Sequence, residues 1–311
     1  MRAIATVLAT CPICGVEPLE PHASGRDFEY QTTGDVEWTL RRCAACDVLA
    51  LSPRPFESEL SLIYPKNYYA YDFTSRQSIG YRVKAFLDRR AAAVYLSYGV
   101  GNVLDVGCGD GRLLRTFAAL GVPAARLFGV ELDARAAEAG RSHGFHIELK
   151  RFEDVDFPDG FFQLILLQQV IEHVPDPRGM IEKLSRLLAP GGAAILETPN
   201  TVSWDHSLFK NRYWGGYHIP RHFFLFNKRS LRVLLERAGL SVANVRSLAS
   251  PMFWIHSIHH ALAESRFPSF LLRVFDPYPP NPLALSFFTA IDTVGKVLGI
   301  TSNMRVVAVK R

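Results

Sequence analysis

The chain has 311 residues, of which 48% are hydrophobic and 21% charged, and its formal net charge is +5. This length allows one large domain together with a smaller one. The first 80 residues contain seven Lys or Arg and ten Asp or Glu, so this quarter has a net charge of −3. That sign argues against an N-terminal nucleic-acid module, because such modules are usually basic. The apolar run at the N-terminus is too short to span a bilayer, and we expect a cytoplasmic protein.

The chain opens with two CxxC pairs, separated by 28 residues and formed by Cys11, Cys14, Cys43 and Cys46. Each pair can place two thiolates on one tight turn, and two such turns complete a tetrahedral site for one structural zinc ion. Two disulfides or a redox-active CxxC are the alternatives. Between the pairs, residues 28–30 and 36–40 are predicted to be strands of a ribbon.

Residues 53–71 are rich in proline and tyrosine, which predicts a linker that lies on the next domain. Its tyrosines are Tyr64, Tyr68, Tyr69 and Tyr71. These side chains either line a substrate pocket or pack against the domain. From residue 77 to residue 98 the sequence predicts a helix that leads into the next motif.

A buried strand, a glycine turn and a helix follow one another after this linker. Residues 103–106 are predicted to form the strand, and residues 112–120 a helix with one apolar face. Between them, Gly107, Gly109 and Gly111 would let a ligand approach the backbone, because glycine has no Cβ atom. This arrangement is typical of a cradle for a small molecule.

An acidic residue follows the glycine turn at the spacing of a nucleotide-binding βαβ unit. Residues 127–131 are predicted to form a second strand that ends in Glu131, which can accept hydrogen bonds from both hydroxyls of a ribose. The GxGxxG fingerprint of NAD-binding proteins does not fit, and the phosphate-binding GxxxxGK[ST] motif is absent. We therefore do not expect NAD to bind.

Strands and helices alternate through the following residues. Further strands are predicted over residues 146–150, 163–169, 193–197 and 242–248, and a last antiparallel strand over residues 305–310. Helices are predicted over residues 134–141 and 227–238, and another is predicted to end at residue 188. This alternation predicts a parallel, doubly wound sheet that binds its ligands at the carboxyl ends of the strands.

Several sequence strings resemble those of a known family. VLDVGCGDG at 103–111 and GVELD at 129–133 resemble the class I S-adenosylmethionine (SAM)-dependent methyltransferases, and EHVPDP, LAPGG and ETPN resemble the branch with the ubiquinone-pathway O-methyltransferases. The resemblance covers about residues 100–250. It implies an α/β fold with a doubly wound, mostly parallel, seven-stranded Rossmann-like sheet. The four-cysteine region, with its zinc-ribbon-like pattern, also resembles that of sugar C-methyltransferases, which carry a further C-terminal domain that this chain is too short to hold.

The resemblance also implies SAM as cofactor, held by Asp105, Gly107, Cys108, Gly109, Gly111, Glu131, Leu132, Phe152, Glu153, Asp154 and Gln168. The chain departs from the family before the FPDG turn, where members often have Asp-Ala and this chain has Arg151 and Phe152. We expect Phe152 to stack on the adenine, and Glu153 or Asp154 to accept a hydrogen bond from its amine.

Methyl transfer from a sulfonium requires alignment of donor and acceptor and often removal of a proton from the acceptor. His173, just past the fourth strand, is the first candidate for the general base, and His218 and His222 are the others. Glu172 is expected to orient a histidine or to contact the methionine end of the cofactor. Residues 201–222 are expected to roof the acceptor with the aromatic side chains of Trp204, Tyr213, Trp214 and Tyr217.

The predicted domain division places the zinc-binding region and linker at 1–75, the methyltransferase domain at 76–250, an apolar helical insertion at 251–303 and the last strand at 304–311. Within the insertion, one helical face is predicted to carry Ala284, Phe287, Phe288, Ile291, Val294 and Leu298. This face either docks on the domain or lies against a membrane or an apolar substrate, which leaves peripheral membrane association open.

The expected function is methyl transfer to a hydroxyl or an activated carbon of a small molecule, such as a sugar or a lipid-linked intermediate. Two other classes stay open: an RNA or protein methyltransferase that uses the zinc region for recognition, and a non-catalytic module that binds SAM or zinc. A nucleic-acid partner is not expected, because the first quarter is acidic and no Asn-Pro-Pro-Tyr-like tetrapeptide follows the fourth strand. The sequence does not indicate the oligomeric state.

Overall fold

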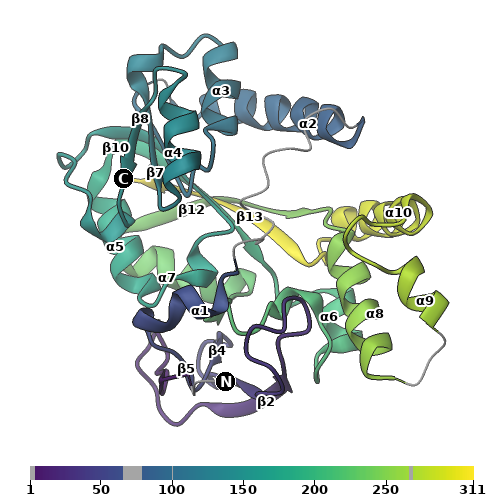
Figure 1. Ribbon diagram of the computed structural model, residues 1–311. Coiled ribbons are helices and arrows are strands. Elements are labelled where there is room, and N and C mark those ends of the chain that lie inside the picture. The colour runs from purple at the N-terminus through teal and green to yellow at the C-terminus, as the bar shows by residue number, and fades with distance from the viewer. Residues whose placement is uncertain (1–3, 66–78, 100, 266–268) are drawn as a thin grey trace.

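The protein is described here by a computed structural model that covers residues 4–65, 79–99, 101–265 and 269–311. A large central sheet carries helices on both faces, the N-terminal strands lie at one end, and a group of C-terminal helices projects at another side (Figure 1). Tyr68, Tyr69 and Tyr71, predicted to line a pocket or to pack, fall outside the described residues.

The central sheet has seven strands in the order β12-β13-β10-β9-β6-β7-β8. In chain order these strands are β6 (Val103–Val106), β7 (Leu127–Glu131), β8 (His146–Leu149), β9 (Phe162–Gln168), β10 (Leu188–Pro199), β12 (Leu240–Leu248) and β13 (Asn303–Lys310). Strands β8, β7, β6, β9 and β10 pair in parallel, whereas β13 pairs antiparallel with both β10 and β12. The predicted doubly wound, mostly parallel seven-stranded sheet is confirmed.

The direction of winding reverses between β6 and β9, because the chain runs from β6 toward β8 on one side and from β9 toward β10 on the other. Open α/β sheets bind ligands at this reversal, outside the carboxyl ends of the strands. The glycine turn after β6 and the segment after β9 both begin at this place, so the fold brings the predicted cofactor and base residues to one edge.

Helices cover the two faces of the sheet, and alternate residues of each strand point to opposite faces. Val103 and Leu164 pack in the cluster that contains α2, α3 and α4, whereas Leu104 and Ile165 pack in the cluster that contains α5 and α7. These helices are α2 (Ile79–Leu96), α3 (Arg112–Ala119), α4 (Ala134–Arg141), α5 (Pro177–Leu187) and α7 (Lys228–Arg237). Wherever the sequence predicted the first or last residue of one of these helices, the observed residue lies within two positions of it.

The N-terminal region forms two small sheets. Strand β11 (Phe224–Leu225), from the long segment after β10, joins one of them in the order β11-β4-β3-β2, and β1 pairs with β5 in the other. The remaining elements here are β1 (Thr6–Val7), β2 (Glu20–Gly25), β3 (Trp38–Arg42), β4 (Leu49–Leu51), β5 (Arg54–Pro55), the 3-10 helix η1 (Glu57–Glu59) and α1 (Leu60–Ile63). The buried side chains of this region belong to the same core cluster as those of α5 and α7. The predicted domain limits remain predictions, but the two parts share a sheet and a core.

The predicted strand at residues 28–30 is wrong, because this segment forms a turn. The Asp27 carboxylate causes it: its two oxygens accept hydrogen bonds from the backbone nitrogens of Tyr30 (3.0 Å) and Thr32 (2.8 Å). An aspartate that satisfies nearby backbone donors in this way favours a turn over a strand. The strand predicted over residues 36–40 overlaps the observed strand β3 (Trp38–Arg42).

The described residues between β12 and β13 form three helices: α8 (Met252–Glu264), α9 (Ser269–Val274) and α10 (Pro282–Leu298). They gather beside α6 (Trp204–Phe209), at the right of Figure 1. The predicted apolar face of α10 is divided: Ala284 and Phe288 are buried, whereas Phe287, Val294 and Leu298 are 55–61% exposed. Among the described residues, no helix combines the length and the hydropathy needed to cross a membrane.

Candidate active site

The glycine turn after β6 has the conformation that the sequence predicts. Gly107, Gly109 and Gly111 have φ values of 72°, 55° and 76°, a region that favours glycine. The backbone nitrogens of Gly107 and Cys108 both donate to the Val130 carbonyl, at 2.9 and 3.1 Å, which fixes the turn to the end of β7. A Cβ atom on Gly107 would lie 3.0 Å from Val170, so a side chain there would crowd the segment that follows β9.

Glu131, the last residue of β7, faces this turn. Its carboxylate accepts hydrogen bonds from the backbone nitrogens of Gly109 (2.8 Å), Leu132 (2.6 Å) and Asp133 (2.9 Å). Among the described residues, one carboxylate oxygen receives only the Gly109 bond, so it can accept a further hydrogen bond. The side chain of Leu132 is 67% exposed beside it. A fixed acid with spare acceptor capacity is suited to a ribose hydroxyl.

Asp105 lies within β6 and is almost fully buried. Burial, followed by the negative charges of Glu131 and Glu197, raises the pKa of the Asp105 carboxyl to about 8. Burial likewise raises the pKa of the Cys108 thiol, which makes this cysteine unreactive. A positively charged ligand at this edge of the sheet would offset the acidic cluster.

The other predicted cofactor residues occupy different environments. Phe152 is 3% exposed within the 3-10 helix η4 (Phe152–Asp154), and Lys183 Nζ lies 5.6 Å from the centre of its ring. Glu153 and Asp154 are exposed beside it. Gln168, at the end of β9, donates to Glu197 Oε1 at 3.1 Å. Their predicted roles toward adenine and the cofactor stay predictions.

Three predicted catalytic histidines lie together past the carboxyl end of the sheet. The ring centre of His173 is 4.6 Å from that of His222 and 6.2 Å from that of His218, and the last two are 5.0 Å apart. His173 comes from the 3-10 helix η5 (Ile171–His173), directly after β9, whereas the others come from the loop near the 3-10 helix η6 (Gly215–Tyr217). The fold thus unites residues that are about 45 positions apart in the sequence.

The hydrogen bonds of these histidines differ. His173 Nδ1 lies 2.9 Å from the Tyr64 hydroxyl and 3.1 Å from the Arg221 carbonyl, and burial lowers the pKa of His173 to about 3. His222 Nδ1 lies 2.9 Å from the Gly216 carbonyl, and burial lowers its pKa as well. Both imidazoles are therefore neutral near pH 7.

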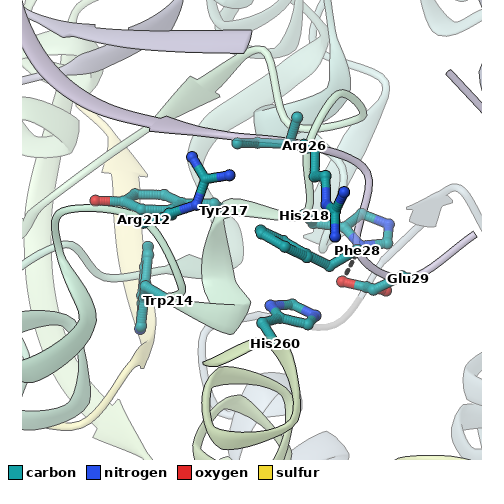
Figure 2. Close-up of a pocket in the computed structure, with 9 residues that line it drawn as sticks. Arg26, Phe28, Glu29, Arg212, Trp214, Tyr217, His218 and His260 are labelled. Carbon is teal, nitrogen blue, oxygen red and sulfur yellow. Dashed lines mark hydrogen bonds and ion pairs between the residues drawn. The ribbon is translucent and has the colours of Figure 1, made fainter. Parts of the chain in front are cut away.

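His218 has a carboxylate partner. Its Nδ1 lies 2.8 Å from Glu29 Oε1, and both side chains are 6% exposed (Figure 2). A carboxylate in this position holds Nδ1–H as the donor and leaves Nε2 as the proton acceptor. The backbone of His218 is left-handed, with φ of 41°, a strained conformation that clusters at functional sites.

Sequence analysis did not identify Glu29 as a site residue. A second contact fixes the turn that carries Glu29. The guanidinium of the fully buried Arg221 donates two hydrogen bonds to the Asp27 carboxylate, from Nη2 at 2.9 Å and from Nη1 at 3.1 Å. The Arg221 guanidinium also lies 4.5 Å from the centre of the Tyr30 ring. No local pattern signals these contacts, because their partners are 189 or more positions apart in the sequence.

Glu172 is fully buried beside the histidines. Its Oε2 accepts a hydrogen bond from the Thr198 hydroxyl at 2.9 Å, whereas Oε1 has no hydrogen-bond partner among the described residues. Burial raises the pKa of Glu172 to about 8, so the carboxyl is protonated near neutral pH. Among the described residues it makes no hydrogen bond to a histidine ring, and its predicted role toward a histidine or the methionine end of the cofactor stays a prediction.

Aromatic residues of the predicted roof lie mostly inside the protein. Trp214 and Tyr217 are 1% and 2% exposed, and Trp214 Nε1 donates to Asp205 Oδ2 at 2.8 Å. Tyr213 donates to Glu264 at 3.0 Å. Trp214 and Tyr217 nevertheless line a small pocket together with His218, as Figure 2 shows.

The four predicted zinc ligands converge at the end of the N-terminal unit. Cys14 Sγ lies 3.3 Å from Cys11 Sγ and 3.4 Å from Cys43 Sγ, and Cys46 Sγ lies 3.4 Å from Cys11 Sγ. All four thiols are free, which excludes the alternative of two disulfides in this structure. Four thiols at such separations fit a tetrahedral zinc site with no open position, which is the structural type.

Comparisons with known proteins identify the family of the chain. The methyltransferase domain family matches residues 65–245. A ubiquinone biosynthesis O-methyltransferase of Xanthomonas oryzae pv. oryzae is 35% identical over 106 residues, which cover 32% of this chain and 43% of the relative. Another from Neisseria meningitidis is 28% identical over 179 residues, or 53% of this chain and 72% of the relative. The chain thus spans less than half of the first relative.

A solved structure supports the fold alone. It is the complex between the Haloferax volcanii Trm112 methyltransferase activator and a methyltransferase, and it matches with a TM-score of 0.51 and 17% identity over 74% of this chain and 92% of that one. The family match extends over more than half of the chain and contains the glycine turn, Glu131 and the β9 edge. The chain therefore belongs to the SAM-dependent methyltransferase family.

Proposed function

We propose that this chain transfers a methyl group from SAM to a hydroxyl of a small, ring-bearing acceptor, with His218 as the general base. The His218–Glu29 pair carries the proposal, because a base held by a carboxylate and placed at the cofactor edge is the arrangement that proton removal requires. The curated relatives are named O-methyltransferases, which favours oxygen over carbon as the acceptor atom.

His218 is preferred over His173, the first choice from the sequence, for an electrostatic reason. A histidine that accepts a proton becomes a cation, and the adjacent Glu29 carboxylate would stabilise that charge. His173 is surrounded by a tyrosine hydroxyl and a carbonyl, and its pKa of about 3 makes it a weak base. We assign His173 and His222 to the wall that positions the acceptor.

The residues of the glycine turn would hold the cofactor. When bound, SAM supplies an electrophilic methyl group on a sulfonium. Glu131 would accept hydrogen bonds from the ribose, the backbone at Gly107 and Gly109 would allow close approach, and the acidic cluster around Asp105 would favour a cationic ligand. The chain's own contribution is then orientation of the two reactants and removal of the acceptor proton.

The four cysteines would hold Zn²⁺ as a structural ion. The zinc-binding unit supplies Glu29, and its Asp27–Arg221 ion pair fixes the loop that carries His218. We infer that the unit builds one wall of the acceptor site. The acceptor could be a sugar or a lipid-linked intermediate, since the exposed apolar face of α10 offers a contact for a lipid surface.

Product analysis tests this proposal. The purified protein is incubated with SAM and a panel of phenols, catechols and nucleotide sugars, and release of S-adenosylhomocysteine is measured together with the site of methylation. With a productive acceptor, His218→Ala should reduce turnover about 10²–10⁴-fold, the loss typical of a missing general base, while SAM affinity stays nearly unchanged. His143→Ala, at an exposed histidine in the turn after α4, is the control and should retain full turnover.

A His218→Ala variant with wild-type turnover would show that His218 is not the base. If His173→Ala alone abolished turnover, the assignment would revert to the residue that the sequence favoured. Methylation on carbon rather than oxygen would contradict the choice of acceptor atom.

A further inference from the structure

Three side chains of types that can ligate a metal, from two distant segments, converge near the N-terminal unit. Glu29 belongs to the turn after β2, and His256 and His260 lie one turn apart on α8. One ligand atom from each residue lies within 4.8 Å of the others. Figure 2 shows His260 rising from α8 toward the segment that carries Phe28 and Glu29. Two histidines at i and i+4 share one helix face, which is a common way to present two metal ligands.

Two ring nitrogens of this group lack the partner that a buried polar atom needs. His256 Nδ1 and His260 Nε2 have no hydrogen-bond partner among the described residues, and the two side chains are only 9% and 3% exposed. Buried polar atoms are almost always hydrogen-bonded, so each exception requires an explanation. A bound ion would satisfy both nitrogens at once.

We propose that Glu29, His256 and His260 bind a divalent transition-metal ion of the zinc type, at a site separate from the four cysteines. Two imidazoles and one carboxylate are a known donor set for zinc with an open position, which water or a substrate oxygen can fill. A zinc ion holds its ligand atoms roughly 3.4 Å apart, given bonds of about 2.0–2.1 Å, so small side-chain movements would close the site.

Neighbouring residues support this assignment. Glu29 Oε1 accepts a hydrogen bond from His218, and a metal-binding carboxylate is normally oriented by such an outer partner. The nearby cations Arg26 and Arg212 are paired with Glu264, at 3.1 and 2.6 Å, and Arg212 also pairs with Glu37, so they do not compete for Glu29. The small pocket beside His260 gives the open position access to a ligand.

Metal stoichiometry and cobalt spectroscopy of the full chain test the proposal. After incubation with Zn²⁺ and removal of the excess, the wild type should contain about two equivalents per chain. His260→Ala should contain one, with affinity for the second ion weakened at least about a hundredfold, since loss of an outer partner alone costs 10–100-fold. His259→Ala is the matched control on the same helix and should keep two, because His259 is not part of the group.

Co²⁺ separates the two sites, because a cysteine site gives an intense thiolate-to-metal charge-transfer band that a nitrogen and oxygen site lacks. Cys43→Ser should lose this band but keep the weaker visible absorption, and His260→Ala should show the reverse. Thermal melting verifies that each variant is folded, and Glu29→Gln replaces His260→Ala if that variant is not. One equivalent in the wild type, or two equivalents in both His260→Ala and Glu29→Gln, would overturn the proposal.

Discussion

Glu29 Oε1 lies 2.8 Å from His218 Nδ1, although the two residues are 189 positions apart in the sequence. Glu29 belongs to the four-cysteine unit and His218 to the loop above the carboxyl edge of the large sheet. The contact therefore links the folding of the four-cysteine unit to the geometry of the proposed acceptor site. Asp27 and Arg221 make a second such link with no exposed surface.

Loss of the zinc site should consequently affect the acceptor side more than the cofactor side. Cys43→Ser should contain one metal equivalent less than the wild type and melt at a lower temperature, because a structural zinc site contributes on the order of 10 kcal/mol to its unit. SAM affinity should survive, since the glycine turn and Glu131 are held by hydrogen bonds to the end of β7 and not by the four-cysteine unit. Turnover should fall because Glu29 is no longer held against His218.

Elemental analysis, thermal melting, calorimetry with SAM and an activity assay make up this test. Ser24→Ala, on a strand of the same unit but outside the cysteine cluster, is the control for a general effect of mutation. Equal metal content in Cys43→Ser and the wild type would exclude Cys43 as a ligand. Full turnover in a metal-depleted variant would separate the zinc site from the acceptor site.

The cofactor site makes a separate prediction. Glu131→Ala should weaken SAM binding roughly ten- to a hundredfold, as expected for the loss of hydrogen bonds to a charged group. The variant also releases the backbone nitrogens of Gly109 and Leu132, which would loosen the turn. Isothermal titration calorimetry measures the change, with Glu138→Ala on the exposed face of α4 as the control. An unchanged affinity would mean that the ribose is held elsewhere, and measurable NAD binding would contradict the family assignment.

Local patterns were sufficient for the sheet and for the glycine turn. The apolar strand before Gly107, the alternating glycines and the acid at Glu131 are all encoded within 30 residues, so their geometry follows from short-range sequence. The four cysteines were equally visible, because thiolate pairs at CxxC spacing have few other uses. Those features were predicted and appear together in the structure.

Long-range partners were not visible in the sequence. The strand expected at Phe28 is a turn because the Asp27 carboxylate binds two backbone nitrogens and is itself held by Arg221. That turn places Glu29 beside His218. Because residues 28–30 were predicted to be a strand, this contact was not predicted. The apolar face of α10 was predicted as one stripe, but only tertiary packing decides which part of it is covered.

Two buried carboxyls should make the stability of the unliganded protein depend on pH. The pKa values of Asp105 and Glu172 are raised to about 8 in the folded protein, mainly by burial, from about 4 in an unfolded chain. The folded state therefore holds protons that the unfolded state has lost. The stability contribution is complete below pH 4 and is lost as the pH rises toward 8, by up to about 1.4 kcal/mol per pH unit for each group.

Thermal melting between pH 6.5 and pH 8 measures this slope. Buried histidines with lowered pKa values, such as His173 and His222, still titrate in the unfolded chain near pH 6.5, so the carboxyl contribution is read from the difference between a variant and the wild type. Glu172→Gln, which imitates the protonated acid, should reduce the loss of stability across the window, whereas the exposed Glu182→Gln should not. Parallel curves for Glu172→Gln and the wild type would contradict a raised pKa at this site.

The outer face of α10 yields the last prediction. Leu283, Phe287, Val294 and Val297 are 55–84% exposed and follow one another at three, four or seven residues, so they form one apolar stripe along the helix. The nearby Arg273 and Lys296 are exposed and basic. An apolar stripe with basic neighbours suits a helix that lies in the interface of an anionic membrane.

We expect the protein to co-sediment with vesicles that contain anionic lipid, and less strongly at high salt, which screens the basic residues. Replacing Phe287 and Val297 with Ser should reduce binding several-fold while the melting temperature stays within a few degrees, because neither side chain is buried. The matched variant Thr289→Ser and Thr293→Ser alters the exposed polar positions of the same helix and should bind as the wild type does. Equal sedimentation of the Phe287/Val297 variant and the wild type, or none by either protein, would leave the stripe without a membrane role.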